Sequence, residues 1–140
     1  MNLFSTNYSK KILDFWLLFL RICVSGFMLT HGFPKLITLL SGNEIQFPDV
    51  IGIGATSTLV LVVFSEFICS LLIGIGLATR FASFALICTM MVAAFIAHGS
   101  DPFGKKELAL LYLLIYVTIL VVGSGKYSVD YYLNKNKKRG

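Results

Sequence analysis

Four apolar segments, each about the length that crosses a lipid bilayer, constrain this chain more than any other feature of its sequence. They cover about residues 12–33, 55–77, 81–98 and 107–122, and only short polar loops connect them. In hydrocarbon every backbone amide must find a partner inside the protein, so segments of this kind form α-helices. The sequence therefore predicts an all-α, polytopic membrane protein: a bundle of four transmembrane helices in a single domain of residues 1–140.

The composition excludes an ordinary soluble protein. Hydrophobic residues make up 56% of the chain and charged residues only 14%, and the mean hydropathy is +0.81. A formal net charge of +5 would suggest nucleic-acid binding in a soluble chain. In a membrane protein it reflects topology and attraction to anionic lipid. We therefore expect the lipid bilayer as a partner and no nucleic acid.

Lysine and arginine residues in the loops predict the orientation, because short cytoplasmic loops carry an excess of them. One end of the predicted bundle carries eight such residues: Lys10, Lys11, Arg80, Lys126, Lys135, Lys137, Lys138 and Arg139. The other end carries three: Lys35, Lys105 and Lys106. Both termini, with a basic tail over residues 126–140, are therefore predicted in the cytoplasm, and the chain is expected to be a multi-pass protein of the cell inner membrane.

Two charges of opposite sign lie near the middle of apolar segments, Arg21 in the first and Glu66 in the second. A lone charge in hydrocarbon costs at least ~2.5–3.5 kcal/mol, so such residues usually face a partner or a cavity. Counted from the cytoplasmic ends at 1.5 Å per residue, their depths are roughly 13 Å and 16 Å. We therefore expect the two side chains to be neighbours. They would act either as a structural ion pair that fixes helix register or as the charged floor of a polar cavity.

Further polar residues gather at the predicted outer ends of the helices. His31 and Lys35 are four residues apart and share a face if the helix continues, although Pro34 is expected to break or bend it. His98 and Glu107 flank the loop between the third and fourth segments. A histidine there could relay protons or hydrogen-bond a carbonyl oxygen. The plain alternative is that these residues cap helix ends and contact lipid head groups.

The predicted ligand-binding or polar-cavity site therefore consists of six side chains: Arg21, His31, Lys35, Glu66, His98 and Glu107. A polar stripe along the first helix would join Arg21 to His31 and Lys35. No catalytic residue is assigned. Two histidines without carboxylates or thiols at ligand spacing do not predict a metal site.

Two further patterns are assigned structural roles. The cysteines at positions 23, 69 and 88 form no C-x-x-C motif, and all fall in apolar segments, so we expect inert packing. Gly123–Ser128 resembles a phosphate-binding loop, but Tyr127 stands where that motif needs serine or threonine. This stretch is predicted to be a glycine-rich helix stop followed by an interfacial anchor.

The order of these motifs resembles the DoxX family of small four-helix membrane proteins. The matching motifs are Leu20-Arg21, His31-Gly32 followed by Lys35, Glu66, Gly74–Arg80, Met91-Val92-Ala93 leading to His98, Glu107, and the closing Gly123–Asp130, which resembles G-x-G-x-[YF]-S-x-D. The resemblance covers about residues 12–130. It implies a four-helix membrane fold and an association with thiosulfate:quinone oxidoreductase or with redox and thiol-stress complexes.

Two functions follow from the residues and the resemblance together. The first is a quinone-linked or redox-associated membrane component, with quinone as its candidate cofactor and an oxidoreductase complex as its setting. Candidate partners are then an apolar small molecule such as quinone, a soluble or membrane redox protein, and a second copy of the chain. The alternative is a non-enzymatic scaffold or accessory subunit, or a small-molecule or ion transporter, in which the midplane carboxylate carries a coupled proton.

Overall fold

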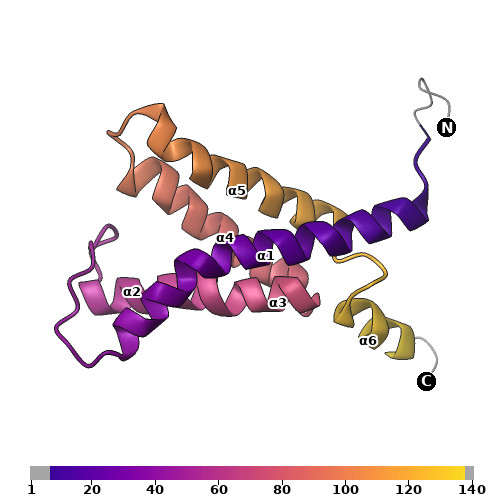
Figure 1. The fold of residues 1–140 in the computed structure, drawn as a ribbon, viewed down its shortest axis with the longest axis horizontal. Coiled ribbons are helices and arrows are strands. Elements are labelled where there is room, and N and C mark those ends of the chain that lie inside the picture. The colour runs from indigo at the N-terminus through magenta and orange to yellow at the C-terminus, as the bar shows by residue number, and fades with distance from the viewer. Residues whose placement is uncertain (1–6, 138–140) are drawn as a thin grey trace.

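The computed structural model describes residues 7–137, which form a bundle of four helical rods with a short helix at one end (Figure 1). The first rod is α1 (Lys10–Leu40), and the second is a continuous helix made of α2 (Ala55–Val63), η1 (Phe64–Cys69) and α3 (Ser70–Ile75). The third rod is α4 (Thr79–Val92) continued by η2 (Ala93–Ala97), and the fourth is α5 (Phe103–Val122). The short helix is α6 (Val129–Lys137), and η1 and η2 are π-helical. The predicted basic tail is thus partly helical, and its residues 138–140 lie outside the described part.

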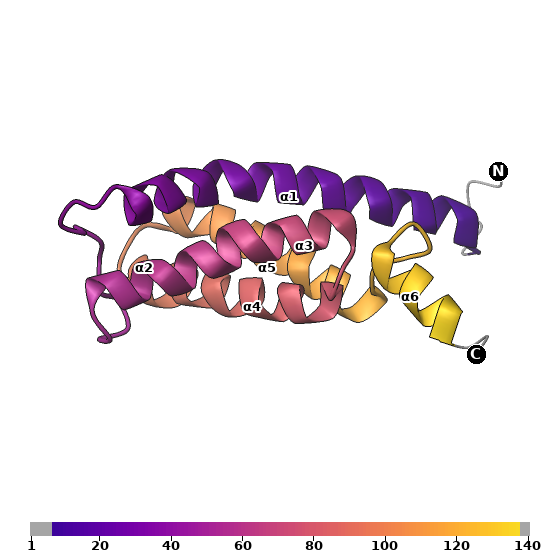
Figure 2. The ribbon, with the colours of Figure 1, turned by 90° about the horizontal axis from the view of Figure 1, so that it is seen from below.

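The rods pack in a ring in which neighbours run antiparallel. α1 lies against the second rod, the second rod against α4, α4 against α5, and α5 closes the ring on α1 (Figure 2). One end of the bundle, here called the termini end, holds the start of α1, the turn between α3 and α4, and α6. The opposite loop end holds the connections 41–54 and 98–102.

Three rods in the described part are long and apolar enough to cross a membrane: Lys10–Leu40, Ala55–Ile75 and Thr79–Ala97. The bundle is also apolar outside and partly polar inside. Large apolar side chains such as Phe15, Phe27 and Leu114 are exposed. Arg21, Glu66 and several serine and threonine side chains are buried. This distribution suits a protein surrounded by hydrocarbon rather than by water.

The fourth rod, α5, is 20 residues long. Lys105, Lys106 and Glu107 lie near its start, so every window of spanning length within it carries three charges. These charges stand at the loop end, where α5 begins (Figure 1). The rest of α5 is apolar and packs along α4.

Pro34 was expected to break or bend the first helix, and it does not break it, because α1 continues through Pro34 to Leu40. Proline removes one backbone donor, and membrane helices tolerate that loss when neighbouring groups compensate. On either side of the proline a hydroxyl also bonds to the helix backbone: Thr38 donates to the carbonyl oxygen of Pro34 at 3.0 Å, and Thr30 donates to that of Phe27 at 2.7 Å. The extra helix length carries Lys35 on the same rod as His31.

Two glycines let α1 and the second rod approach closely. A Cβ on Gly32 would lie 2.7 Å from the backbone carbonyl group of Glu66. A Cβ on Gly74 would lie 3.4 Å from the hydroxyl of Ser25. Helices in membranes associate through such small residues because lipid provides no hydrophobic drive between them. Gly32 on α1 and Gly74 on α3 therefore each allow a close contact between the two rods.

We expect Gly32→Ala to destabilise the bundle, because the new methyl group would meet backbone atoms that cannot move aside. The expected loss is about 1–3 kcal/mol, measured as a lower midpoint of thermal unfolding in detergent. Gly26→Ala is the matched control, since Gly26 lies on the same helix with open space around its Cβ position. That variant should be neutral or gain up to about 1 kcal/mol from helix propensity. Equal effects of the two substitutions would contradict this packing.

Candidate functional site

An ion pair between Lys35 and Glu66 lies inside the loop-end half of the bundle. Lys35 Nζ is 2.7 Å from Glu66 Oε1 and 2.6 Å from Oε2. The Glu66 side chain is 7% exposed, whereas that of Lys35 is 30% exposed. Lys35 is thus positioned by the part of α1 beyond Pro34, and Glu66 by η1. The Glu66 carboxylate is therefore paired and mostly buried, whereas its partner Lys35 is partly exposed.

A cavity of about 180 Å³ opens beside this pair and is called the loop-end cavity. Its polar lining includes Lys35, Glu66, His31, His98 and Tyr112. The rings of His31 and Tyr112 meet edge to face, with centroids 6.2 Å apart. Apolar walls come from three helices, through Met28, Met90, Ala93, Leu108 and Ala109. The cavity therefore combines hydrogen-bonding groups with an apolar surface, which is the usual composition of a small-molecule site.

Both π-helical segments lie against this cavity. η1 contains Glu66, and η2 supplies Ala93 to the lining and ends directly before His98. A π-helical turn holds one residue more than an α-helical turn, and such turns are often found at functional sites. Neither segment contains proline or glycine, so no residue in the sequence marked them.

The rim of the cavity at His98 is held by an ionic cluster in the connection 98–102. His98 Nδ1 lies 2.8 Å from Asp101 Oδ2, and Lys105 Nζ lies 3.5 Å from Asp101 Oδ1. The hydrogen bond from His98, helped by the charge of Lys105, holds the pKa of the Asp101 carboxyl below its usual value. A charged Asp101 orients the His98 ring through Nδ1, which leaves Nε2 free of that bond.

The predicted neighbourhood of Arg21 and Glu66 is wrong. The Arg21 guanidinium donates to the carbonyl oxygens of Ile73 and Tyr127, near the termini end. Glu66 pairs with Lys35 instead. The α1 residues beside Glu66 are Gly32, which packs against its backbone, and Lys35, which pairs with its carboxylate. Eleven residues of helix separate Arg21 from Gly32, which is roughly 16 Å at 1.5 Å per residue.

The depth estimate failed because the helix ends are not level. α3 ends at Ile75, and Gly76 packs directly on the Arg21 side chain. α1 therefore extends for about three turns beyond the end of α3, from Arg21 back to Lys10. The predicted depths were counted from helix ends assumed to lie at the same level, and this placed Arg21 too close to the level of Glu66.

Of the six predicted side chains, the structure brings four together at the loop-end cavity: His31, Lys35, Glu66 and His98. Arg21 lies at the other end of the bundle, and Glu107 is exposed, without a hydrogen bond or ion pair to any residue in 7–137. The polar stripe along α1 is also interrupted, because Val24 and Met28 are buried apolar residues between Arg21 and His31. Sequence reasoning missed Tyr112, whose hydroxyl in an apolar segment was the available signal.

Arg21 organises a second polar cluster at the termini end. Gly76 has φ +75°, and its missing side chain makes room for the guanidinium. The carboxylate of Asp130 accepts the backbone N–H groups of Ala78 and Thr79 at 2.8 and 2.9 Å. The amide of Asp130 in turn donates to Gly76. The segment Ser124–Asp130 is thus tied to α1 and to the α3–α4 turn, and we call it the C-terminal clasp.

The site residues carry no metal-binding arrangement, since residues 7–137 contain no group of three histidine, cysteine, aspartate or glutamate side chains placed to hold an ion. The cysteines lie in different settings: Cys69 is buried, Cys23 is half-buried and Cys88 is exposed, and all three are free. The loop-end cavity can instead offer hydrogen bonds from Lys35, the two histidines and Tyr112 to an oxygen-bearing ligand.

The chain is similar to proteins of two bacteria, one of which is named as an inner membrane protein. The sequence profile described as DoxX matches residues 16–99. An uncharacterized protein of Haemophilus influenzae is 32% identical over 135 residues, covering 89% of this chain and 95% of that protein. The "Inner membrane protein YqjF" of Escherichia coli K12 is 29% identical over 130 residues, covering 90% of this chain and 98% of that protein. No solved structure matches the chain.

We expect Arg21→Lys to loosen the C-terminal clasp. Two different nitrogens of Arg21 reach Ile73 and Tyr127, and a single ammonium group cannot reproduce both bonds. Leaving a buried carbonyl without its donor should cost about 1–3 kcal/mol of stability and speed tryptic cleavage after Lys126. Arg80→Lys is the control, because Arg80 is exposed at the same end and makes no hydrogen bond or ion pair within residues 7–137. A clasp that is cleaved equally slowly in both variants would refute this role of Arg21.

Proposed function

This chain belongs to the DoxX family, and we propose that it is a multi-pass inner-membrane component that binds the head group of a quinone-like molecule in its loop-end cavity. The single observation that carries the proposal is the Lys35–Glu66 pair, which lies against His31, His98 and Tyr112 in a cavity with methionine walls. A quinone has carbonyl oxygens that accept hydrogen bonds and a ring that packs on apolar side chains. The cavity offers both kinds of contact.

The charges of the cavity favour a neutral ligand. Lys35 and Glu66 cancel each other, and Lys105 at the rim pairs with Asp101. An ionic ligand would have to displace a partner from one of these pairs, which is costly for the buried carboxylate. A neutral carbonyl compound can accept a hydrogen bond from Lys35 while the ammonium group remains beside Glu66. The quinone class meets this condition.

The size of the cavity favours a head group rather than a whole lipid-soluble molecule. Its volume of about 180 Å³ lies below the ~300–1,000 Å³ of sites that enclose drug-sized ligands. A single ring fits this space, and a tail would leave between the helices toward lipid. Exposed apolar side chains such as Phe27, Phe95 and Leu108 lie on α1, η2 and α5, three of the elements around the cavity. They offer a surface along which such a tail can lie.

Exchange of protons fits the same residues. Reduction of a quinone adds protons to its oxygens, so a site of this class benefits from groups that donate and accept them. His98 is oriented by Asp101, and Glu66 is held in the cavity by Lys35. Any electrons would come from a redox partner outside this chain, because the sequence contains no cofactor-binding motif. A place in a quinone-linked assembly is therefore the setting we infer.

We also propose four membrane crossings with both termini in the cytoplasm. α5 is antiparallel to α4, and its charged start stands at the loop end together with the 41–54 connection. Most loop lysines and arginines lie at the termini end. With this topology the loop-end cavity opens toward the outer face of the inner membrane.

Purified protein in lipid nanodiscs should bind a short-chain quinone, measured by calorimetric titration. Lys35→Gln should weaken binding about ten-fold or more, because a hydrogen bond from a charged donor is lost. The double variant Lys35→Gln/Glu66→Gln removes both charges without leaving either unpaired, so it separates loss of binding from loss of folding. Glu107→Gln should bind like the wild type, since Glu107 does not line the cavity. Wild-type protein that binds no quinone, or a double variant that binds it fully, would contradict the proposal.

Reporter fusions should resolve the crossings at both ends of α5. Alkaline phosphatase, which is active only outside the cytoplasm, should be active when fused after Gly99 and inactive when fused after Gly125. Green fluorescent protein at the C-terminus should fluoresce, because it folds in the cytoplasm. Equal phosphatase activity at the two positions would mean that α5 does not cross the membrane.

A further inference from the structure

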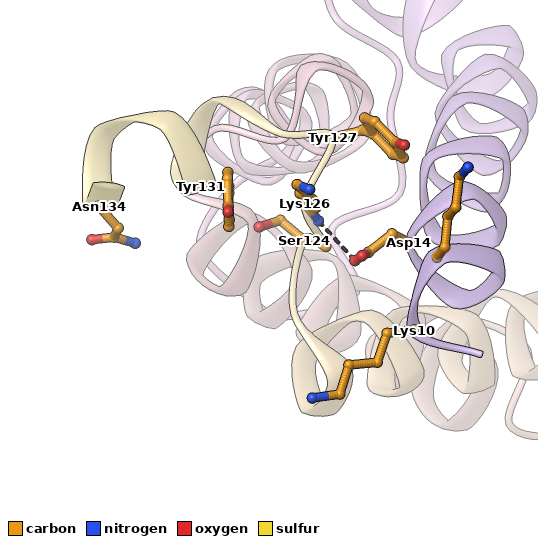
Figure 3. A pocket seen from close by; sticks show the side chains of 9 residues that line it. Lys10, Asp14, Ser124, Lys126, Tyr127, Tyr131 and Asn134 are labelled. Carbon is orange, nitrogen blue, oxygen red and sulfur yellow. Dashed lines mark hydrogen bonds between the residues drawn. The ribbon is translucent and has the colours of Figure 1, made fainter. Parts of the chain in front are cut away.

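We propose that a second cavity, at the termini end, binds the phosphate group of an acidic glycerophospholipid. This termini-end cavity has a volume of about 740 Å³ and lies between the start of α1 and the chain that joins α5 to α6 (Figure 3). It shares no lining residue with the loop-end cavity. Its role is therefore independent of the proposed quinone site.

The cavity has an uncompensated positive charge. Lys10, Lys11 and Lys126 line it, and none of them makes a salt bridge with a residue in 7–137. Asp14 is the acidic residue in the lining, and its Oδ1 accepts the backbone N–H of Lys126 at 2.9 Å. Three lysines and one aspartate line this cavity, which gives the lining a net positive charge. An anion is the ligand that such a site attracts.

The fold holds this cavity in place. Figure 3 shows the bond from Lys126 to Asp14 that joins the C-terminal clasp to α1. Gly125 has φ +72°, and a Cβ on it would lie 3.2 Å from Leu17 Cδ1, while the carbonyl of Tyr127 is held by Arg21. Lys126 is therefore fixed by its backbone opposite the first turns of α1. These tertiary contacts bring Lys10 and Lys126, which are far apart in sequence, into the lining of one cavity.

The level of the cavity favours a lipid over a soluble phosphate compound. Lys10 is the first residue of α1, which is long and apolar enough to cross the membrane. Tyr127 and Tyr131 line the cavity and are exposed, and Trp16 is exposed on α1. Tyrosine and tryptophan gather where the hydrocarbon meets the head groups. The ammonium groups therefore lie at the level of lipid phosphates.

The lining also suits the rest of a lipid head group. The amide of Asn134 and the hydroxyls of tyrosines can hydrogen-bond phosphate or glycerol oxygens. Below them α1 exposes Ile12, Phe15 and Phe19, along which acyl chains can pack. A zwitterionic head group brings its own ammonium toward the three lysines, whereas phosphatidylglycerol and cardiolipin do not. We therefore infer selectivity for the acidic lipids.

Native mass spectrometry of the full chain, released from detergent with defined lipids, tests this inference. Wild-type protein should retain phosphatidylglycerol or cardiolipin in preference to phosphatidylethanolamine. Lys10→Gln/Lys126→Gln should weaken retention of acidic lipid on the order of thirty-fold, since each lysine near the surface is worth about five-fold. Lys135→Gln/Lys137→Gln is the matched control: it removes the same charge from α6 without touching the cavity lining. This control should bind like the wild type.

Each other outcome would overturn the assignment. Equal losses in the two double variants would mean general attraction to a basic surface rather than a site. No loss in either would mean that the cavity does not bind the lipid. If glycerol 3-phosphate displaces the lipid at equal concentration, the ligand is a soluble phosphate and the assignment to lipid is wrong. Circular dichroism should show equal helix content in all variants. Quinone binding is unaffected in every case if the proposed function is correct.

Discussion

The buried guanidinium of Arg21 is the interaction on which the termini end of the bundle depends. Arg21 is 0% exposed, and no carboxylate lies within salt-bridge distance of it among residues 7–137. Its charge is balanced by backbone carbonyls of α3 and the C-terminal clasp, and by electrostatic attraction to Asp130. Because a cation in hydrocarbon is expensive, the chain must bring those groups to it. The closing motif Gly123–Asp130 is therefore understood as part of the fold: it carries Tyr127 and Asp130 to the arginine.

Between the two charged clusters the interior of the bundle remains partly polar. Ser25, Ser70, Ser83 and Tyr116 come from four different rods and are buried, and the hydroxyls of Ser25 and Ser83 make no hydrogen bond to any described residue. Such groups weaken the core, yet they are small or planar and allow close helix contact, as Ser25 does against Gly74. Packing at small residues and tertiary bonds at the ends therefore hold the rods together, because lipid removes the hydrophobic drive that would do so in water. Side-chain bonds join α1 to the rest of the chain toward both ends, through Lys35–Glu66 in the loop-end half and Arg21–Tyr127 near the termini end.

The sequence was sufficient for the class of fold and for the importance of its buried charges, but not for their partners. Hydropathy predicted the apolar helices because most of their side chains, including those exposed on the outside of the bundle, are hydrophobic. The pairing of Arg21 with Glu66 was wrong because it assumed level helix ends, whereas Gly32 and Gly76 fix a stagger that only packing reveals. Lys35 was expected near the site, but its pairing with Glu66 was not predicted, because Pro34 suggested that the helix does not continue to Lys35. The π-helical turns at Glu66 and before His98 could not be predicted, since neither segment contains glycine or proline.

The two cavities differ in charge, and this difference is the basis for proposing different ligands at the two ends of the bundle. At the loop end every lysine of the cavity has a carboxylate partner, Lys35 with Glu66 and Lys105 with Asp101. At the termini end the carboxylates of Asp14 and Asp130 are occupied by backbone amides, so lysines of that cavity stay unpaired. A neutral oxygen-bearing ring suits the first site and an anionic head group the second. The same structural need, to anchor the clasp with Asp14 and Asp130, thus leaves the lysines of one end free for lipid. The proposed selectivity for acidic lipid at that end therefore follows from the hydrogen bonds that Asp14 and Asp130 accept from backbone N–H groups.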